Sequence, residues 1–153
     1  MAWAYYNLGS LYIDQGKLAD AEQICQQALA GFETALGPTH TSTLSTVNNF
    51  GLLYWNQGKL AEADQMFERA LVGFEAALGP EHTSTLRAVN NLGFLYIDQG
   101  KLVEAEQMFE RALKGFEKAL GHEHPSTLTV VNSLNTLYRN QGNWWRLRHA
   151  SGC

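Results

Sequence analysis

The feature that most constrains this chain is a 42-residue repeat. Three glycines, Gly9, Gly51 and Gly93, occupy the same position in successive copies. The same step relates the sequence Gln-Gly-Lys-Leu at 15–18 to its copies at 57–60 and 99–102. Self-similarity at a fixed period of this length is typical of proteins that stack one small structural unit. We therefore expect every 42-residue segment to form the same unit of secondary structure.

Each segment predicts a pair of helices. Val89, Leu92, Gly93 and Tyr96 are spaced three, four and seven residues apart, which places them on one face of a helix. A second apolar stripe follows after the Gln-Gly pair, and its small alanines alternate with large phenylalanines. We expect the first helices of the pairs, here called A helices, at residues 2–14, 44–56, 86–98 and 128–140. The second helices, here called B helices, are expected at residues 18–36, 60–78 and 102–120.

Glycines mark both the ends and the close contacts of these helices. Gly16, Gly58 and Gly100 are expected to end the A helices in the left-handed conformation. A glycine inside a helix costs about 1 kcal/mol relative to alanine, so the repeated interior glycines indicate close helix packing. Serines and threonines at 41–43 and 83–85 offer N-caps for the following A helices. The short loops between helices predict antiparallel neighbours.

The composition of the chain disfavours several classes of binding partner. The net charge of −4 disfavours nucleic acid as the main partner, because phosphate binding needs a concentrated basic surface. No apolar run reaches the roughly 18 residues that cross a bilayer, so we expect no membrane partner. Two cysteines give no disulfide framework, and Cys25 occupies the position that holds Phe67 and Phe109 in the other segments. We expect a cytoplasmic protein.

These motifs carry a resemblance to a known family. The pattern Asn-Asn-Leu-Gly-x-Leu-Tyr, then Gln-Gly-Lys-Leu-x-Glu-Ala-Glu, Arg-Ala-Leu and Leu-Gly-x-x-His, resembles the tetratricopeptide repeat, or TPR. The 42-residue length is similar to that of the kinesin light chain subclass, and similar arrays occur in fungal NACHT and NB-ARC receptors. The resemblance implies an all-α fold, a right-handed superhelix (α-solenoid) of antiparallel helix pairs. We expect a TPR array at 1–142, with helix pairs at 1–42, 43–84 and 85–126, a capping helix at 127–142 and an irregular tail at 143–153.

The concave side of such a superhelix is lined by A helices, so the A-helix face opposite the core is the predicted binding site. Asn7, Asn49 and Asn91 recur at one position of this face. A side-chain amide both donates and accepts, so it pairs well with the backbone of an extended peptide, and the resemblance implies that role. The candidate peptide-binding residues are Asn7, Asn48, Asn49, Leu52, Trp55, Asn56, Arg87, Asn90, Asn91, Phe94, Asp98 and Asn132.

The sequence leaves two interpretations of this face open. In the first, the chain is a non-catalytic scaffold that binds a protein or peptide partner, with Leu52, Trp55 and Phe94 as apolar anchors. In the second, the asparagines form structural bonds between helices, and the chain is an oligomerising part of a larger signalling receptor or motor-adaptor array, self-associating through the ends of the stack. No nucleophile motif, zinc signature or phosphate loop is present. We therefore expect neither enzyme activity nor a cofactor or metal.

Overall fold

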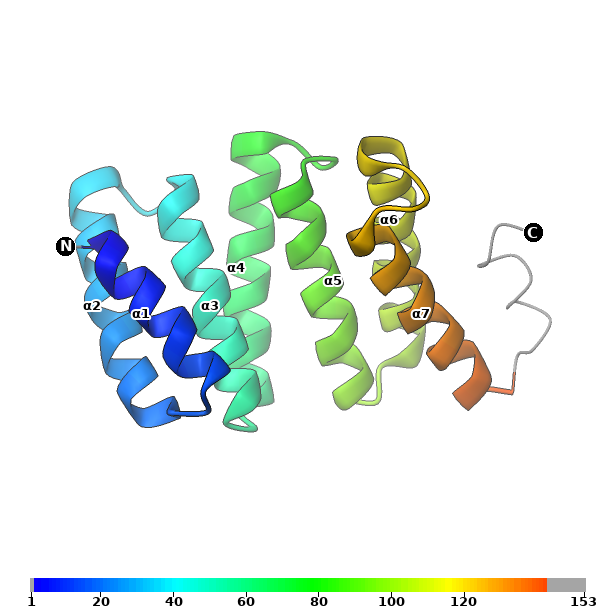
Figure 1. Cartoon of the computed structure of the whole chain (residues 1–153), viewed down its shortest axis with the longest axis horizontal. Helices are drawn as coiled ribbons and strands as arrows, with labels where there is room; N and C mark the ends of the chain where they lie inside the picture. Colours follow the sequence, from blue (N-terminus) through cyan, green and yellow to red (C-terminus); the bar gives the residue numbers. More distant parts are fainter. Residues whose placement is uncertain (1, 143–153) are drawn as a thin grey trace. The chain divides into compact units, whose positions relative to one another are not determined.

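The computed structural model of the chain describes residues 2–142, which form seven α-helices and no strand. Each helix pair runs down and back with a short connection, as Figure 1 shows for α1 and α2. The predicted irregular tail, residues 143–153, lies outside the described residues. The helices are α1 (Ala2–Asp14), α2 (Leu18–Leu36), α3 (Thr41–Asn56), α4 (Leu60–Leu78), α5 (Thr83–Asp98), α6 (Leu102–Leu120) and α7 (Pro125–Asn140).

The A helices α1, α3 and α5 end just before Gly16, Gly58 and Gly100, as predicted. Gly16, Gly58 and Gly100 have φ of 73°, 77° and 75°, which confirms the left-handed stop. At Gly58 the backbone closes a Schellman motif, because Gly58 N–H donates to Trp55 O at 2.9 Å and Lys59 N–H donates to Tyr54 O at 2.8 Å. The Lys59 ammonium also lies 5.4 Å from the centre of the Tyr54 ring. The turn therefore satisfies the last carbonyls of α3 and fixes the entry into α4.

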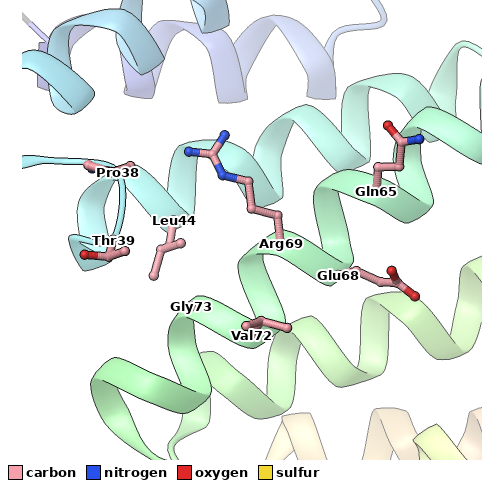
Figure 2. A pocket seen from close by; sticks show the side chains of 8 residues that line it. All are labelled: Pro38, Thr39, Leu44, Gln65, Glu68, Arg69, Val72 and Gly73. Atoms are coloured by element: carbon pink, nitrogen blue, oxygen red, sulfur yellow. The ribbon is translucent and has the colours of Figure 1, made fainter.

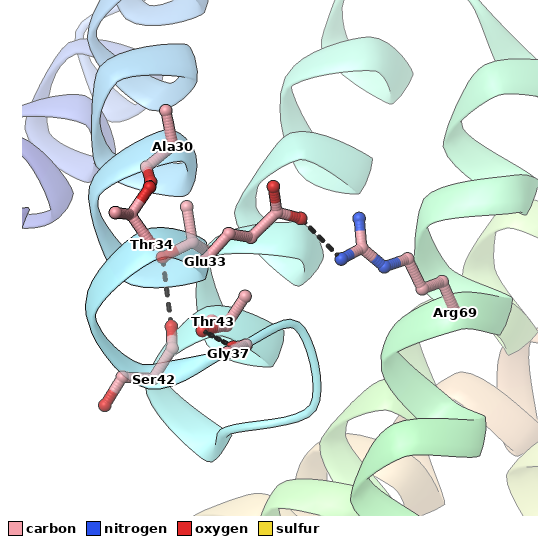
Figure 3. A network of polar contacts seen from close by, with 8 residues as sticks. Ala30, Glu33, Thr34, Gly37, Ser42, Thr43 and Arg69 are labelled. Atoms are coloured by element: carbon pink, nitrogen blue, oxygen red, sulfur yellow. Dashed lines mark hydrogen bonds and ion pairs between the residues drawn. The ribbon is translucent and has the colours of Figure 1, made fainter.

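The A helices α3, α5 and α7 begin three residues earlier than predicted, because histidine caps them. His40 has extended backbone angles and its Nδ1 accepts a hydrogen bond from Ser42 N–H at 3.1 Å. His82 Nδ1 likewise accepts from Ser84 N–H, and His124 Nδ1 accepts from Ser126 N–H. The prediction of serine or threonine N-caps was wrong at α3 and α5. Thr43 instead donates from Oγ1 to Gly37 O at 2.7 Å, which ties the start of α3 to the end of α2 (Figure 3).

The interior glycines of α3 to α6 lie against large side chains, which confirms the close packing that their recurrence predicted. A Cβ on Gly51 of α3 would lie 2.5 Å from the Phe67 ring of α4. A Cβ on Gly73 of α4 would lie 2.4 Å from Leu44 Cδ2 of α3. The two helices of this pair therefore interlock at both ends, each through a glycine that admits a side chain of the other helix.

The chain divides into two compact units, Met1–Pro80 and Glu81–Cys153. The first unit contains α1 to α4. Its α2 packs against both A helices α1 and α3, and one core cluster contains Ile13, Ala21, Cys25, Phe50 and Leu53 from these three helices. In the second unit, α6 packs against both α5 and α7. The buried apolar side chains of α6 and α7 there are Ala105, Phe109, Ala112, Phe116, Val130, Leu134, Leu137 and Tyr138.

Candidate functional site

The first unit presents half of the predicted peptide site on α1 and α3. The structure places Asn7 and Asn56 in exposed positions, whereas Asn48, Leu52 and Trp55 are half-buried. The face therefore alternates amide groups with partly covered apolar side chains. Such a surface suits a segment that offers both backbone hydrogen-bonding groups and apolar side chains.

Asn49 differs from the other predicted residues of this unit. Its side chain is only 9% exposed, and Nδ2 donates to Ser10 Oγ at 2.7 Å, from α3 to α1. Ser10 Oγ in turn donates to the carbonyl of Tyr6 at 3.1 Å. The chain of bonds uses the Asn49 amide to join the two A helices. The sequence left open whether this asparagine binds a peptide or forms a structural bond between helices. The structure contains the interhelix bond.

The second unit carries the remaining predicted residues on α5 and α7. Arg87, Asp98 and Asn132 are exposed, and Asn90, Asn91 and Phe94 are half-buried. The Phe94 ring meets the Phe109 ring of α6 edge-on, with centroids 5.1 Å apart. Part of the Phe94 side chain therefore packs in the core of its own helix pair. The Oδ1 atom of Asn90 is enclosed and accepts no hydrogen bond from the residues that the structure describes.

The ionisable groups of the first unit indicate packing rather than reaction chemistry. Burial raises the pKa of the Cys25 thiol to about 11, because the core of α1, α2 and α3 disfavours the thiolate. Burial, helped by Glu22 and Glu62, also raises the pKa of the Tyr54 phenol. Among residues 2–142, no three His, Cys, Asp or Glu side chains converge in the way that metal ligands do. No described helix is both long and apolar enough to span a membrane.

An open pocket of about 520 Å³ lies on the first unit, away from the predicted residues (Figure 2). Leu44, Val72 and Gly73 form its apolar part, and Figure 2 shows Arg69 extending from α4 across it. Arg69 Nη2 pairs with Glu33 Oε1 of α2 at 2.7 Å (Figure 3). Both side chains are more than a third exposed, so this surface pair contributes at most about 1 kcal/mol. Sequence reasoning missed the pocket because its lining comes from α4, from the first turn of α3 and from the loop that precedes it.

Two features define the class of protein: antiparallel helix pairs that recur with the 42-residue period, and polar and apolar side chains arrayed along the A helices. This is a helical-repeat protein. The family profile of the tetratricopeptide repeat matches residues 1–76, 48–118 and 84–146, which together cover nearly the whole chain. The chain belongs to the tetratricopeptide repeat family. Members of this family generally act as protein–protein interaction scaffolds and are generally non-catalytic.

Solved structures support the fold. The crystal structure of nearly identical TPR-like repeats from a kinesin light chain-like protein of Podosopora anserina has a TM-score of 0.85 and 24% identity, covering 96% of this chain and 70% of that one. BtubC (BKLC) of P. vanneervenii has a TM-score of 0.87 and 22% identity, covering 97% of this chain and 59% of that one. The predicted all-α TPR solenoid of the kinesin light chain type is thereby confirmed as a fold.

No curated protein matches the sequence. The resemblance to NACHT and NB-ARC receptor arrays stays a prediction, because none of these relatives bears on it. The same holds for the cytoplasmic location.

Proposed function

We propose that the chain binds an extended segment of a partner protein on the A-helix face of its TPR array, the concave side in the predicted superhelix. The observation that supports this most directly lies in the first unit. There Leu52 and Trp55 are half-buried and the amides of Asn7 and Asn56 are exposed, and all four belong to the predicted binding site. The scaffold role that is general to the family supports a protein-binding function for this chain.

The amide side chains and the apolar side chains would contribute differently to the free energy of binding. A hydrogen bond from a side-chain amide to a peptide contributes roughly 1 kcal/mol net. A micromolar complex requires about 8 kcal/mol, so amides alone are insufficient. Trp55 and Leu52 supply apolar area that a bound side chain would cover, and a tryptophan in such a place is a typical hot spot. Asn7 and Asn56 would then set the register of the segment.

The test is selection of a displayed random peptide library on the immobilised full chain, followed by affinity measurements on enriched peptides. We expect Trp55→Ala to weaken binding at least about tenfold, which corresponds to roughly 1.4 kcal/mol. Asn56→Ala should weaken it several-fold. The control is Val72→Ala, because Val72 is 66% exposed on α4 and lies outside the predicted face. Enriched peptides whose affinity depends on Val72 and is unaffected at Trp55 and Asn56 would contradict the proposal.

A structural role, without a peptide ligand, is the second candidate function. The bond from Asn49 to Ser10 favours it, since this recurring asparagine holds two helices together. Light scattering coupled to size exclusion over a concentration series distinguishes the candidates, using the full chain and a chain lacking residues 143–153. A monomer of 17.0 kDa for the full chain, with no association in either form, supports peptide binding. A concentration-dependent oligomer that dissociates on truncation supports the structural role.

A further inference from the structure

The open pocket of about 520 Å³ on the first unit (Figure 2) is formed by one side of α4 together with the start of α3 and the loop before it. Leu44 of α3 packs closely over Gly73 of α4 and is buried, so it forms an apolar floor. Val72 is exposed beside this floor. The lining residues of α4 follow a helical spacing and therefore share one side of the helix: Gln65, Glu68, Arg69, Val72 and Gly73. A cavity of this size accommodates a large side chain together with part of its backbone.

The helices that border the pocket are acidic. Helix α2 contains three carboxylates and no cation, and α4 contains four carboxylates and one cation, Arg69. Arg69 is paired with Glu33 of α2, so its charge is already balanced. Glu68 is exposed and forms no hydrogen bond or ion pair with any residue in the described part of the chain. The apolar floor therefore lies beside an excess of negative charge.

The corresponding helix of the second unit has a different charge pattern. Helix α6 also contains four carboxylates, but it contains three cations. Two of these have no counterpart in α4: Lys114, which stands at the position of Val72, and Lys118. Lys118 Nζ pairs with Glu81 Oε2 at 2.8 Å. The combination of an apolar surface with unbalanced carboxylates is therefore particular to the first unit.

The charge and the apolar floor together indicate the chemistry of the occupant. An apolar surface beside unbalanced carboxylates is complementary to a large apolar side chain that is flanked by lysine or arginine. The same negative charge disfavours phosphate-bearing partners such as nucleic acid. The scaffold role that is general to the family favours a protein as the source of the basic segment.

We propose that the pocket around Leu44 and Val72 is a docking site for a basic segment of a partner protein, in which a large apolar side chain is flanked by lysine or arginine. The apolar side chain covers Leu44 and Val72 and supplies most of the affinity. A flanking cation pairs with Glu68. Because single surface ion pairs are weak, this cation contributes mainly to the choice of partner. None of these residues belongs to the proposed A-helix site, so the two proposals stand independently.

The probe is a set of fluorescein-labelled peptides Gly-Ser-Lys-Lys-Z-Lys-Lys-Ser-Gly, in which Z is Leu, Phe or Trp, and a matched set in which serine replaces every lysine. Binding to the full chain is followed by fluorescence anisotropy. We expect at least one lysine peptide to bind saturably, and at least about tenfold more tightly than its serine counterpart. Raising the salt concentration from about 0.05 M to about 0.5 M should narrow this difference, because salt screens exposed charges. If no lysine peptide binds more tightly than its serine counterpart, the proposal is wrong.

Two variants of the chain locate the binding site. Val72→Lys introduces the residue that α6 carries at this position, so it is compatible with the fold. It also places a cation four residues after Glu68, where the two side chains can pair, and it should weaken binding of the lysine peptide at least about tenfold. Glu68→Gln keeps the shape of the side chain and should weaken binding several-fold. Circular dichroism melting of each variant checks that it is folded.

The matched control is Val103→Lys on α6, because Val103 is 65% exposed, close to the 66% of Val72, and the substitution changes the net charge equally. Its affinity should stay within about twofold of the parent. Trp55→Ala should also leave the affinity unchanged, which separates this site from the A-helix face.

Three results overturn the proposal. Equal losses in Val72→Lys and Val103→Lys would mean that the peptide responds only to overall charge. Binding that neither Val72→Lys nor Glu68→Gln weakens would place the peptide elsewhere on the chain. If a chain lacking residues 143–153 binds the lysine peptide at least about tenfold more tightly than the full chain, the occupant is a segment of this chain rather than a partner protein.

Discussion

Replacing Gly51 with alanine tests whether the helix pairs are held together by close glycine contacts. On an exposed helix, alanine in place of glycine stabilises by about 1 kcal/mol. At Gly51 the new methyl would lie 2.5 Å from Cε1 and 2.6 Å from Cδ1 of Phe67. Phe67 is fully buried, so the ring has no free space to move into. Overpacking of this kind costs about 1–3 kcal/mol.

The clash should outweigh the helix propensity, and we expect Gly51→Ala to lower the free energy of unfolding by about 1–2 kcal/mol. In a chain of this size, 1 kcal/mol corresponds to a shift in melting temperature of roughly 2–4 °C. Urea and thermal unfolding of the full chain, followed by circular dichroism and by tryptophan fluorescence, measure the change. Two probes are needed because repeat proteins do not always unfold in one step.

Two further variants separate the clash from a general effect of alanine. A Cβ added at Gly31 would contact only Ala2, whose own Cβ lies 3.1 Å away at the very start of α1. Gly31→Ala should therefore be neutral or stabilising. Combining Gly51→Ala with Phe67→Leu removes the ring edge, and the pair should show a favourable coupling energy of about 1 kcal/mol or more. If Gly51→Ala stabilises the protein as much as Gly31→Ala, the close contact is not what holds these helices together.

Three other predictions follow from single contacts. His82→Ala removes the acceptor that caps α5 and should cost about 1 kcal/mol in urea unfolding, whereas His82→Asn should keep the cap; equal losses would contradict the capping role. In a Cys153→Ser background, Cys25 should react with a thiol reagent far more slowly in the folded protein than in urea, and faster as pH rises toward its pKa of about 11, because only the thiolate reacts. Asn49→Ala should destabilise by about 1–2 kcal/mol, and the loss should shrink in a Ser10→Ala background, because the two share one hydrogen bond.

The B helices could be predicted from sequence to the residue, and the reason is local. Each is bounded by a glycine with positive φ on both sides, for example Gly58 and Gly79 around α4. Glycine accepts this conformation without strain, and the signal lies within a few residues of the helix end. The starts of α3, α5 and α7 were missed because histidine is not among the preferred N-cap residues. Its ability to accept a hydrogen bond through Nδ1 depends on a side-chain orientation that sequence does not reveal.

The candidate site was less predictable because it depends on pairs of residues far apart in the chain. Asn7 and Asn49 have the same place in the repeat, yet Asn7 is exposed and Asn49 is buried against Ser10. The difference arises because α3 has α1 beside it, and no described helix lies on the other side of α1. Periodicity predicts which face a residue occupies. It does not predict whether a neighbouring helix supplies a partner for it.

The helix ends of this chain are determined by residues close in sequence, whereas its hydrophobic core is built from residues of different segments. Every stop and cap, such as the Gly58 turn and the His82 cap, is encoded within a few residues. The core around Phe50, by contrast, is shared between successive segments. A gene duplication or deletion of one 42-residue length therefore leaves all local signals intact and joins surfaces that already fit. Arrays of this type are expected to change length during evolution in whole repeats, and a partial repeat is expected to be lost or repaired.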